Sequence, residues 1–193
     1  SETLNVKMSN ASHNGVQTMD TATVTISNDD IAAVTIADVS VSENAGSATL
    51  TLRLDRAVSG GFSVDVSTSN GSASSGSDYT ALSSKRVTFS GSAGEAETVS
   101  IAINNDSVVE GSETLNVRMS NVSHNGVQIT DTATVTISND DSAAVTIADV
   151  SVSENAGSAT LTLRLDKAVS GGFSVDVSTS NGSASAGSDY TAL

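Results

Sequence analysis

The sequence contains an internal repeat with a period of 111 residues. When residue 1 is aligned with residue 112, residues 1–82 match residues 112–193 at all but seven positions. Most of the substitutions keep size or charge, as Lys7 against Arg118 and Ser75 against Ala186 do. We therefore expect both copies to share one fold and one set of sites. A fixed period of this length is typical of domain arrays, in which the number of copies matters more than any one copy.

The period divides the chain into one complete module, residues 31–141, and two incomplete ones. Residues 1–30 correspond to the end of a module and residues 142–193 to the beginning of another. Because the chain opens and closes within a module, we expect it to be an excerpt of a longer array; head-to-tail pairing of the incomplete ends between chains is the alternative. No Gly/Ser or Pro spacer follows Asn139–Asp141, so we expect neighbouring modules to stack end to end as a rod.

Composition excludes several classes of partner. The chain carries 22 acidic and 8 basic residues, a formal net charge of −14. This charge argues against nucleic acid and anionic lipid as partners and favours cations. There is no Cys, so disulfides, thiolate metal sites and Cys nucleophiles are unavailable. No apolar run approaches the ~20 residues of a membrane span, so we expect no membrane insertion.

Apolar and polar residues alternate in seven short segments of the complete module, as they do in half-buried β-strands. The segments cover residues 34–36, 48–54, 62–67, 87–89, 99–103, 115–119 and 133–137. Turn signals such as Ser59–Gly61 and Asn125–Gly126 separate them, and none has a helical period. The pattern predicts an all-β fold in which each module is an immunoglobulin-like sandwich of two antiparallel sheets. By the repeat, residues 1–30 should carry the last two strands and residues 142–193 the first three.

Acidic residues gather in the loops at one pole of this predicted sandwich, if the strands alternate in direction. That pole receives Glu43, Asp78, Asp106, Glu110, Glu113, Asp140 and Asp141, together with Asn70, Asn105 and Asn139, whereas the other pole has chiefly Asp55, Glu95 and Asp131. Packing so many like charges together is costly unless a cation neutralises them. Ca²⁺ takes roughly six to eight oxygen ligands in flexible geometry, whereas zinc and copper prefer the His or Cys that this pole lacks. We therefore expect a Ca²⁺ site, with a merely solvated acidic surface as the alternative.

Four strings occur in this order in the module: SVSENAG (Ser40–Gly46), NGSASSGSDYTAL (Asn70–Leu82), INNDSVVEGSETLNVRMSN (Ile103–Asn121) and TATVTISNDD (Thr132–Asp141). Together they resemble the Calx-beta domain, which occurs in sodium/calcium exchangers and in large bacterial extracellular adhesins. The resemblance covers the whole module. It implies an immunoglobulin-like sandwich that binds calcium with the loops of one pole.

The resemblance also implies a ligand set, because calcium-binding members use the acids of these four strings. Carried over, the metal site consists of Glu43, Asn70, Asn105, Asp106, the backbone carbonyl of Val108, Glu110, Glu113, Asn139, Asp140 and Asp141, and the repeat adds Glu2, Asp29, Asp30, Glu154 and Asn181 in the incomplete modules. Three positions hold Asn where the tightest-binding relatives hold Asp, so we expect fewer ions or weaker binding. We interpret the segment Gly76–Tyr79 as structural, with Asp78 accepting from loop N–H groups and Tyr79 closing the sandwich edge.

Repetition and acidity together favour a structural function: a calcium-stiffened module repeated along an extracellular or cell-surface adhesin or filament, with neighbouring repeats as partners. A calcium sensor like the exchanger domains is one alternative, although near-identical copies fit it less well than divergent ones. A sugar-binding or protein-binding sandwich is another. We expect no enzyme, because the GxSxG, HExxH, Walker and EF-hand patterns do not occur.

Overall fold

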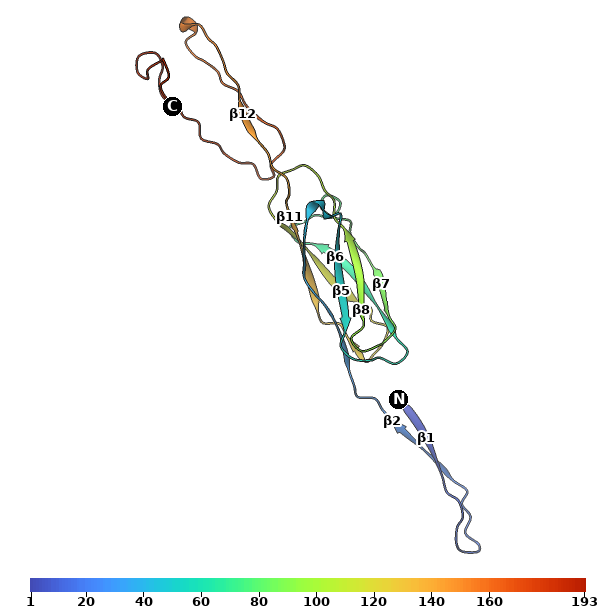
Figure 1. Cartoon of the computed structure of the whole chain (residues 1–193). Helices are drawn as coiled ribbons and strands as arrows, with labels where there is room; N and C mark the ends of the chain where they lie inside the picture. The colour runs from blue at the N-terminus through green and yellow to red at the C-terminus, as the bar shows by residue number, and fades with distance from the viewer.

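The computed structural model describes all of residues 1–193 and shows an elongated molecule, with one complete β-sandwich in the middle and a short strand pair at each end (Figure 1). The only helical elements are two 3-10 turns, η1 (Glu43–Ala45) and η2 (Glu154–Ala156). No helix has the length and apolarity needed to cross a membrane. The all-β class predicted from the alternating pattern is confirmed.

Two sheets form the central sandwich. The first has the strand order β10 (Val127–Gln128), β3 (Ala32–Ile36), β5 (Ser47–Leu54), β8 (Ala96–Ala102). The second has the order β4 (Val39–Ser42), β11 (Thr132–Ser138), β9 (Glu113–Ser120), β6 (Phe62–Asn70), β7 (Lys85–Phe89). Alternate residues of each long strand face the other sheet, which is why the sequence alternates.

The core lies between these sheets and consists of the apolar faces that the alternation predicts. Leu50 and Leu52 of β5 and Val117 of β9 have no solvent exposure. Phe62 and Phe89, on neighbouring strands, stack with ring centroids 4.9 Å apart. The 25 buried hydrophobic residues form one contiguous cluster, so the complete module has its own core.

The first predicted strand is divided between the two sheets. β3 pairs antiparallel with β5, whereas β4 pairs in parallel with β11, and β10 pairs in parallel with β3. Acidic side chains satisfy backbone donors at this crossing: Asp131 accepts from the Ile36 N–H at 2.9 Å, and Asp38 accepts from the Thr134 N–H at 2.7 Å. The module therefore has nine strands, β3 to β11, in place of the predicted seven, and its sheets are mixed, not purely antiparallel.

The N-terminal end reproduces the last part of the module. β1 (Glu2–Lys7) pairs with β2 (Thr21–Ile26) in the register that β9 has with β11: Leu4 lies opposite Val24. The apolar side chains of this strand pair have no second sheet to cover them, and Leu4 is 46% exposed.

The C-terminal end forms less structure than its sequence predicts. β12 (Val145–Ile147) pairs with β13 (Leu163–Leu165), but the third strand expected in residues 142–193 is absent. Residues 173–181 repeat the sequence of β6 letter for letter and form no strand. In the complete module β6 is held by β7 and β9, and the chain has no equivalents of these after residue 142. A strand without a partner leaves its backbone groups unpaired, so this segment remains irregular.

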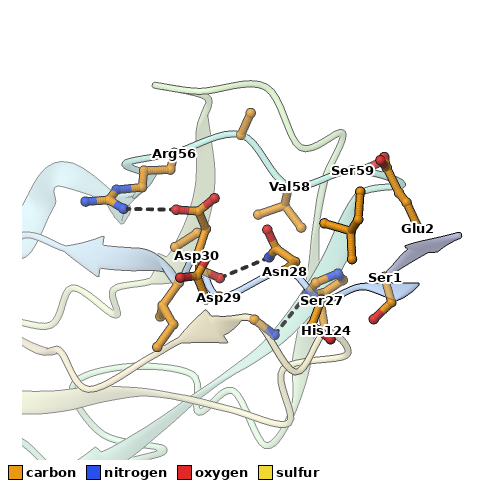
Figure 2. Close-up of a pocket in the computed structure, with 15 residues that line it drawn as sticks. Ser1, Glu2, Ser27, Asn28, Asp29, Asp30, Arg56, Val58, Ser59 and His124 are labelled. Carbon is orange, nitrogen blue, oxygen red and sulfur yellow. Dashed lines mark hydrogen bonds and ion pairs between the residues drawn. The ribbon is translucent and has the colours of Figure 1, made fainter. Parts of the chain in front are cut away.

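The loop between β8 and β9 contacts the next module at the second joint. At the second joint the loop between β8 and β9 (residues 103–112) bonds to the next module: the Val109 N–H donates to the Ala168 carbonyl and the Ser170 N–H donates to the Val109 carbonyl, both at 2.9 Å. At the first joint the equivalents of these partners, Ala57 and Ser59, line a cavity of about 720 Å³ (Figure 2).

Candidate metal centre

Five segments deliver acidic side chains to the pole of the complete module that faces the next module, and one of them is the β6–β7 connection, which carries Asp78. Glu43 lies on η1, which follows β4 and is capped by Gly46, whose φ of 73° is a left-handed conformation that glycine adopts without strain. Glu110 lies in the β8–β9 loop, Glu113 begins β9, and Asp140 follows β11. The alternation of strand direction thus gathers loops that are distant in sequence, as the loop sorting predicted.

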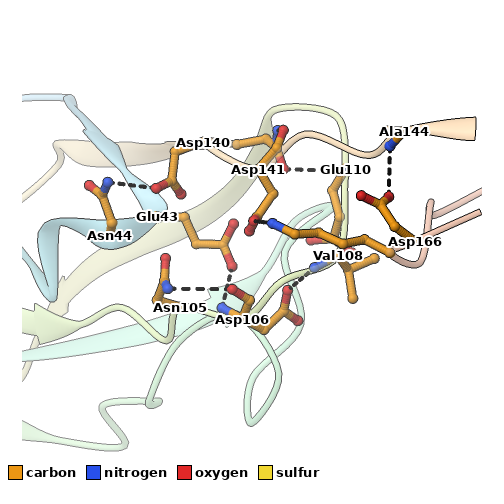
Figure 3. Close-up of polar contacts among 12 residues, drawn as sticks. Glu43, Asn44, Asn105, Asp106, Val108, Glu110, Asp140, Asp141, Ala144 and Asp166 are labelled. Atoms are coloured by element: carbon orange, nitrogen blue, oxygen red, sulfur yellow. Dashed lines mark hydrogen bonds and ion pairs between the residues drawn. The ribbon is translucent and has the colours of Figure 1, made fainter.

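The first cluster consists of Glu43, Asp140 and Asp141, whose carboxylate oxygens lie within 4.8 Å of one another (Figure 3). Glu43 is only 6% exposed. Its Oε1 accepts from the Asp106 N–H at 3.0 Å, and Asp140 accepts from the Asn44 side-chain amide at 2.5 Å. These bonds hold the carboxylates in place.

The second cluster consists of Asp78, Glu110 and Glu113, again with ligand oxygens within 4.8 Å of one another. All three side chains are half-buried. A small cavity of about 10 Å³ lies at the second cluster; its lining includes all three acids of that cluster, Glu43 of the first cluster and Asn139. A cavity of this size holds roughly one water molecule, and therefore one small ion.

Burial and electrostatic repulsion raise the pKa of three carboxyl groups at this pole, those of Glu43, Glu110 and Glu113. Burial, a hydrogen bond with Asp78 and the negative charges of Asp78, Glu110 and Glu43 raise the pKa of Glu113 from 4.5 to about 7. Burial first, and then neighbouring carboxylates, also raise the pKa of Glu43 and of Glu110. A cation bound among these carboxylates would lower their pKa values, because its positive charge favours the ionised form.

Two of the predicted ligands order the β8–β9 loop. Asp106 accepts from the Val108 N–H at 2.7 Å, while Asn105 donates to the Asp106 carbonyl at 3.4 Å. Asn139 joins this loop to the end of β11, because its Oδ1 accepts from the Glu110 N–H at 3.0 Å and its amide donates to the Asp141 carbonyl at 2.8 Å. These residues surround the clusters and set the course of the backbone that carries Glu110.

The structure does not bring Asn70 into either cluster. Its Oδ1 accepts from the Ser75 N–H at 3.0 Å and from the Tyr79 hydroxyl at 2.8 Å. Tyr79 is completely buried. The oxygen that a ligand role would require is thus engaged in fixing the loop after β6.

Asp78 is the cluster member that the predicted ligand set omits. Its carboxylate accepts from the Ser74 N–H at 2.5 Å, the structural role predicted for it, and it also lies in the second cluster. The loop positions placed Asp78 at the acidic pole, but the sequence analysis interpreted it as a structural residue of the turn and did not include it among the ligands. A carboxylate has two oxygens with about four lone-pair sites, so both roles are compatible.

The predicted ligands of the incomplete modules lie apart. Glu2, Asp29 and Asp30 lie at the first joint, where they line the large cavity, and Glu154 lies on η2 near the opposite end of the molecule. Asn181 makes the two bonds of its counterpart in the complete module, to Ala186 and to Tyr190, each at 2.8 Å. This loop therefore forms from local sequence, whereas the clusters require a complete sandwich.

Comparison with known families decides which fold family this is. Residues 27–141 and 142–193 both match the Calx-beta domain. The chain belongs to the Calx-beta domain family. The resemblance read from the four sequence strings is thereby confirmed. Comparison of the chain with curated proteins finds no match.

Solved structures of Calx domains have the same fold. The apo form of the Calx CBD1 domain is 24% identical with a TM-score of 0.53, and the match covers 58% of this chain and 100% of that one. CBD12 from CALX1.2 is 25% identical with a TM-score of 0.51, and the match covers 56% of this chain and 46% of that one. The calcium binding domain CBD12 of CALX1.1 is 27% identical with a TM-score of 0.50, covering 55% and 44%. The chain thus spans less than half the length of the two CBD12 structures.

Proposed function

We propose that the complete module binds Ca²⁺ between its two carboxylate clusters and serves as a stiffened spacer in an array of like modules. The observation that carries the proposal is the convergence of six carboxylates in two neighbouring clusters at one pole. Four of them, from Glu43, Asp78, Glu110 and Glu113, line one small cavity. Burial and neighbouring carboxylates raise the pKa values of Glu43, Glu110 and Glu113, that of Glu113 to about 7, and a bound cation would favour their ionised forms.

The donor set fits Ca²⁺ better than other metals. Both clusters offer carboxylate oxygens only, and no His or Cys contributes. Zinc and copper favour nitrogen or sulfur ligands, whereas Mg²⁺ demands compact octahedral geometry and releases its water reluctantly. Ligands drawn from η1, a turn, a long loop and the end of β11 suit a larger ion that accepts variable coordination.

The position of the clusters supports a stiffening role. Asp141 belongs to the first cluster and accepts a bond from Lys167 of the next module at 2.8 Å. Val109, which bonds to Ala168 and Ser170, directly precedes Glu110 of the second cluster. An ion that fixes Asp141 and Glu110 would thus fix the two segments that hold the next module.

We also propose that the protein acts outside the cell or at the cell surface. Near-identical repeats suit an extracellular or cell-surface adhesin or filament, in which the number of modules sets a length. A calcium sensor is the second candidate, favoured by the likeness to a calcium binding domain at 27% identity. A sensor requires that ion binding change the joint reversibly within the calcium range of a cell, whereas a spacer requires saturation at extracellular calcium, commonly reached by sites with Kd of roughly 10⁻⁴–10⁻³ M.

Calorimetric titration of the full chain with CaCl₂ tests the proposal. We expect saturable binding, weaker binding of MgCl₂, and at least a tenfold loss of affinity in Glu43→Gln. The matched control is Glu97→Gln, which removes one charge from β8 outside both clusters. Absence of saturable calcium binding, or equal losses in the two variants, would contradict it. A Kd near 10⁻⁶ M would favour the sensor.

A further inference from the structure

Four asparagines of the chain are followed directly by glycine: Asn14, Asn70, Asn125 and Asn181. In such a pair the glycine nitrogen can attack the side-chain amide of the asparagine, because glycine has no Cβ to obstruct the approach. The reaction requires a side-chain amide that is free to turn and a base that removes the proton from the attacking nitrogen. The four pairs differ in both respects.

Two of the pairs hold the asparagine side chain away from the attacking nitrogen. The Oδ1 atom of Asn70 accepts from the Ser75 N–H at 3.0 Å and from the Tyr79 hydroxyl at 2.8 Å. Asn181 makes the same two bonds within its own loop. The loop that follows each of these asparagines therefore fixes the amide, which opposes the rotation that attack requires.

The pair Asn125–Gly126, in the turn before β10, has both of the required features. The Asn125 side chain is exposed. The N–H of Gly126 donates to Nδ1 of His124 at 3.0 Å (Figure 2). Because a backbone N–H only donates, this Nδ1 is the unprotonated nitrogen of a neutral imidazole and can accept a proton. A base thus lies in hydrogen-bond contact with the nitrogen that has to lose its proton.

The same sequence occurs a second time with a different arrangement of its histidine. Residues 12–17 and residues 123–128 both read SHNGVQ. In the first copy Nδ1 of His13 lies 2.7 Å from the Asn14 carbonyl oxygen. Because a carbonyl only accepts, this Nδ1 carries the proton and cannot take up another. The arrangement that joins a basic nitrogen to the attacking atom is therefore that of His124.

We propose that Asn125 is a self-modification site, at which His124 is the general base that converts the asparagine to aspartate and isoaspartate. Nδ1 of His124 takes the proton from the Gly126 nitrogen, which forms a bond to Cγ of Asn125. The side-chain nitrogen leaves as ammonia with the proton that His124 returns, and a cyclic imide remains. Water then opens the imide at either carbonyl. The reaction therefore consumes a water molecule and releases ammonia, and it needs no oxidant or cofactor.

The modification acts on the edge of the first sheet. The Ala32 N–H donates to the Gly126 carbonyl at 2.9 Å, and the buried Val127 pairs with Ala32 where β10 meets β3. Isoaspartate adds a methylene group to the main chain directly before Gly126, which displaces this carbonyl. Because β10 is only two residues long, it has little other pairing to hold it. We therefore expect conversion to isoaspartate to loosen β10 from β3.

Mass spectrometry of the full chain during incubation at neutral pH and physiological temperature tests the proposal. In His124→Asn the new side-chain oxygen can still accept from the Gly126 N–H, but it does not take up a proton. We expect conversion of Asn125, measured as the mass gain from amide to acid, to be at least about tenfold slower in this variant. The matched control is His13→Asn, in the identical sequence, and it should leave the rate at Asn125 unchanged.

A chemical rescue separates the base from a merely structural histidine. Free imidazole should accelerate conversion in His124→Ala more strongly than in the parent chain, because it replaces the missing base. In the parent chain Asn70 should remain an amide while Asn125 converts. Equal rates at Asn125 in the parent chain and in His124→Asn, or no rescue of His124→Ala by imidazole, would overturn the proposal.

Hydrogen exchange at the Ala32 amide measures the consequence for the fold. Exchange should be faster in the converted protein than in the fresh one, since Ala32 donates to the displaced carbonyl of Gly126. Asn125→Gln, whose longer side chain disfavours the cyclic imide, should keep its original exchange rate through the same incubation. Exchange at Ala32 that conversion leaves unchanged would overturn the expected loosening of β10.

Discussion

The side-chain amine of Lys167 lies 2.8 Å from a carboxylate oxygen of Asp141, across the joint between two modules. Asp141 is 13% exposed and Lys167 40%, so solvent screens this pair only in part. The hydrogen bond to Asp141, followed by the charges of Asp141, Asp166 and Asp140, raises the pKa of Lys167. The same carboxylate belongs to the first cluster, so the joint and the candidate metal centre share a residue.

Lys167→Ala should loosen the second joint. We expect the exchange of the Val109 and Ser170 amide hydrogens, which bridge the two modules, to become about tenfold faster, because the remaining contact there is mainly this backbone pair. Hydrogen exchange followed by NMR measures both sites. Lys85→Ala, an exposed lysine of β7, is the matched control and should leave both rates unchanged. Unchanged rates in Lys167→Ala would show that the backbone bonds alone hold the joint.

Calcium should raise the melting temperature of the full chain. A ligand at about 100 times its Kd stabilises the folded state by about 2.7 kcal/mol, which corresponds to about 10 °C for a module of this size. Differential scanning calorimetry in calcium, magnesium and chelator measures the shift, and magnesium should restore only a minor part. Identical melting in calcium and in chelator would contradict the proposed metal centre.

Neutralising either cluster should remove most of this calcium-dependent gain. Glu43→Gln removes one negative charge from the first cluster, and Glu113→Gln removes one from the second. Each variant retains a side-chain oxygen, and the two residues lie on different segments. Asp131→Asn should lower stability in all conditions, because it weakens the bond to the Ile36 N–H, yet the calcium-dependent gain should stay. A full calcium gain in both glutamate variants would place the ion elsewhere.

Without calcium, the module should become less stable as the pH rises from about 4.5 to about 7. In this range the folded state binds more protons than the unfolded state, because burial and neighbouring acids raise the pKa of Glu113 from 4.5 to about 7. Glu113→Gln should flatten the dependence, and calcium affinity should increase over the same range as protons leave the ligands. Urea unfolding at a series of pH values in chelator checks the sign. Stability that instead rises from pH 5 to pH 7 would contradict the raised pKa.

Tyr79→Phe should separate loop structure from metal binding. The substitution removes the 2.8 Å bond to Asn70, and we expect a loss of about 1 kcal/mol of unfolding free energy in chelator and in calcium alike. Chemical unfolding in both conditions measures it. A loss that appears only in calcium would make Asn70 part of the metal centre.

Much of the fold could be predicted because the information is local. Alternation in residues 48–54 identifies the buried face of β5, and the loop containing Asn181 forms its bonds even without a sandwich around it. The division of the first strand could not be predicted, since it depends on Asp38 and Asp131 meeting donors almost a hundred residues away in sequence. The second cluster was only partly predictable, because the role of Asp78 depends on where the β8–β9 loop folds back.

Residues 62–70 and 173–181 have the same sequence but different secondary structure, so they separate what sequence determines from what tertiary structure determines. Both read FSVDVSTSN, so the amino-acid pattern alone determined that each has one apolar face and can form a strand. Only the first became a strand, β6, because β7 and β9 lie beside it and pair with its backbone. The second has no such neighbours, and its Phe173 stays half exposed. A β-strand takes its hydrogen bonds from other strands, not from itself, so its presence is decided by what the rest of the chain places next to it.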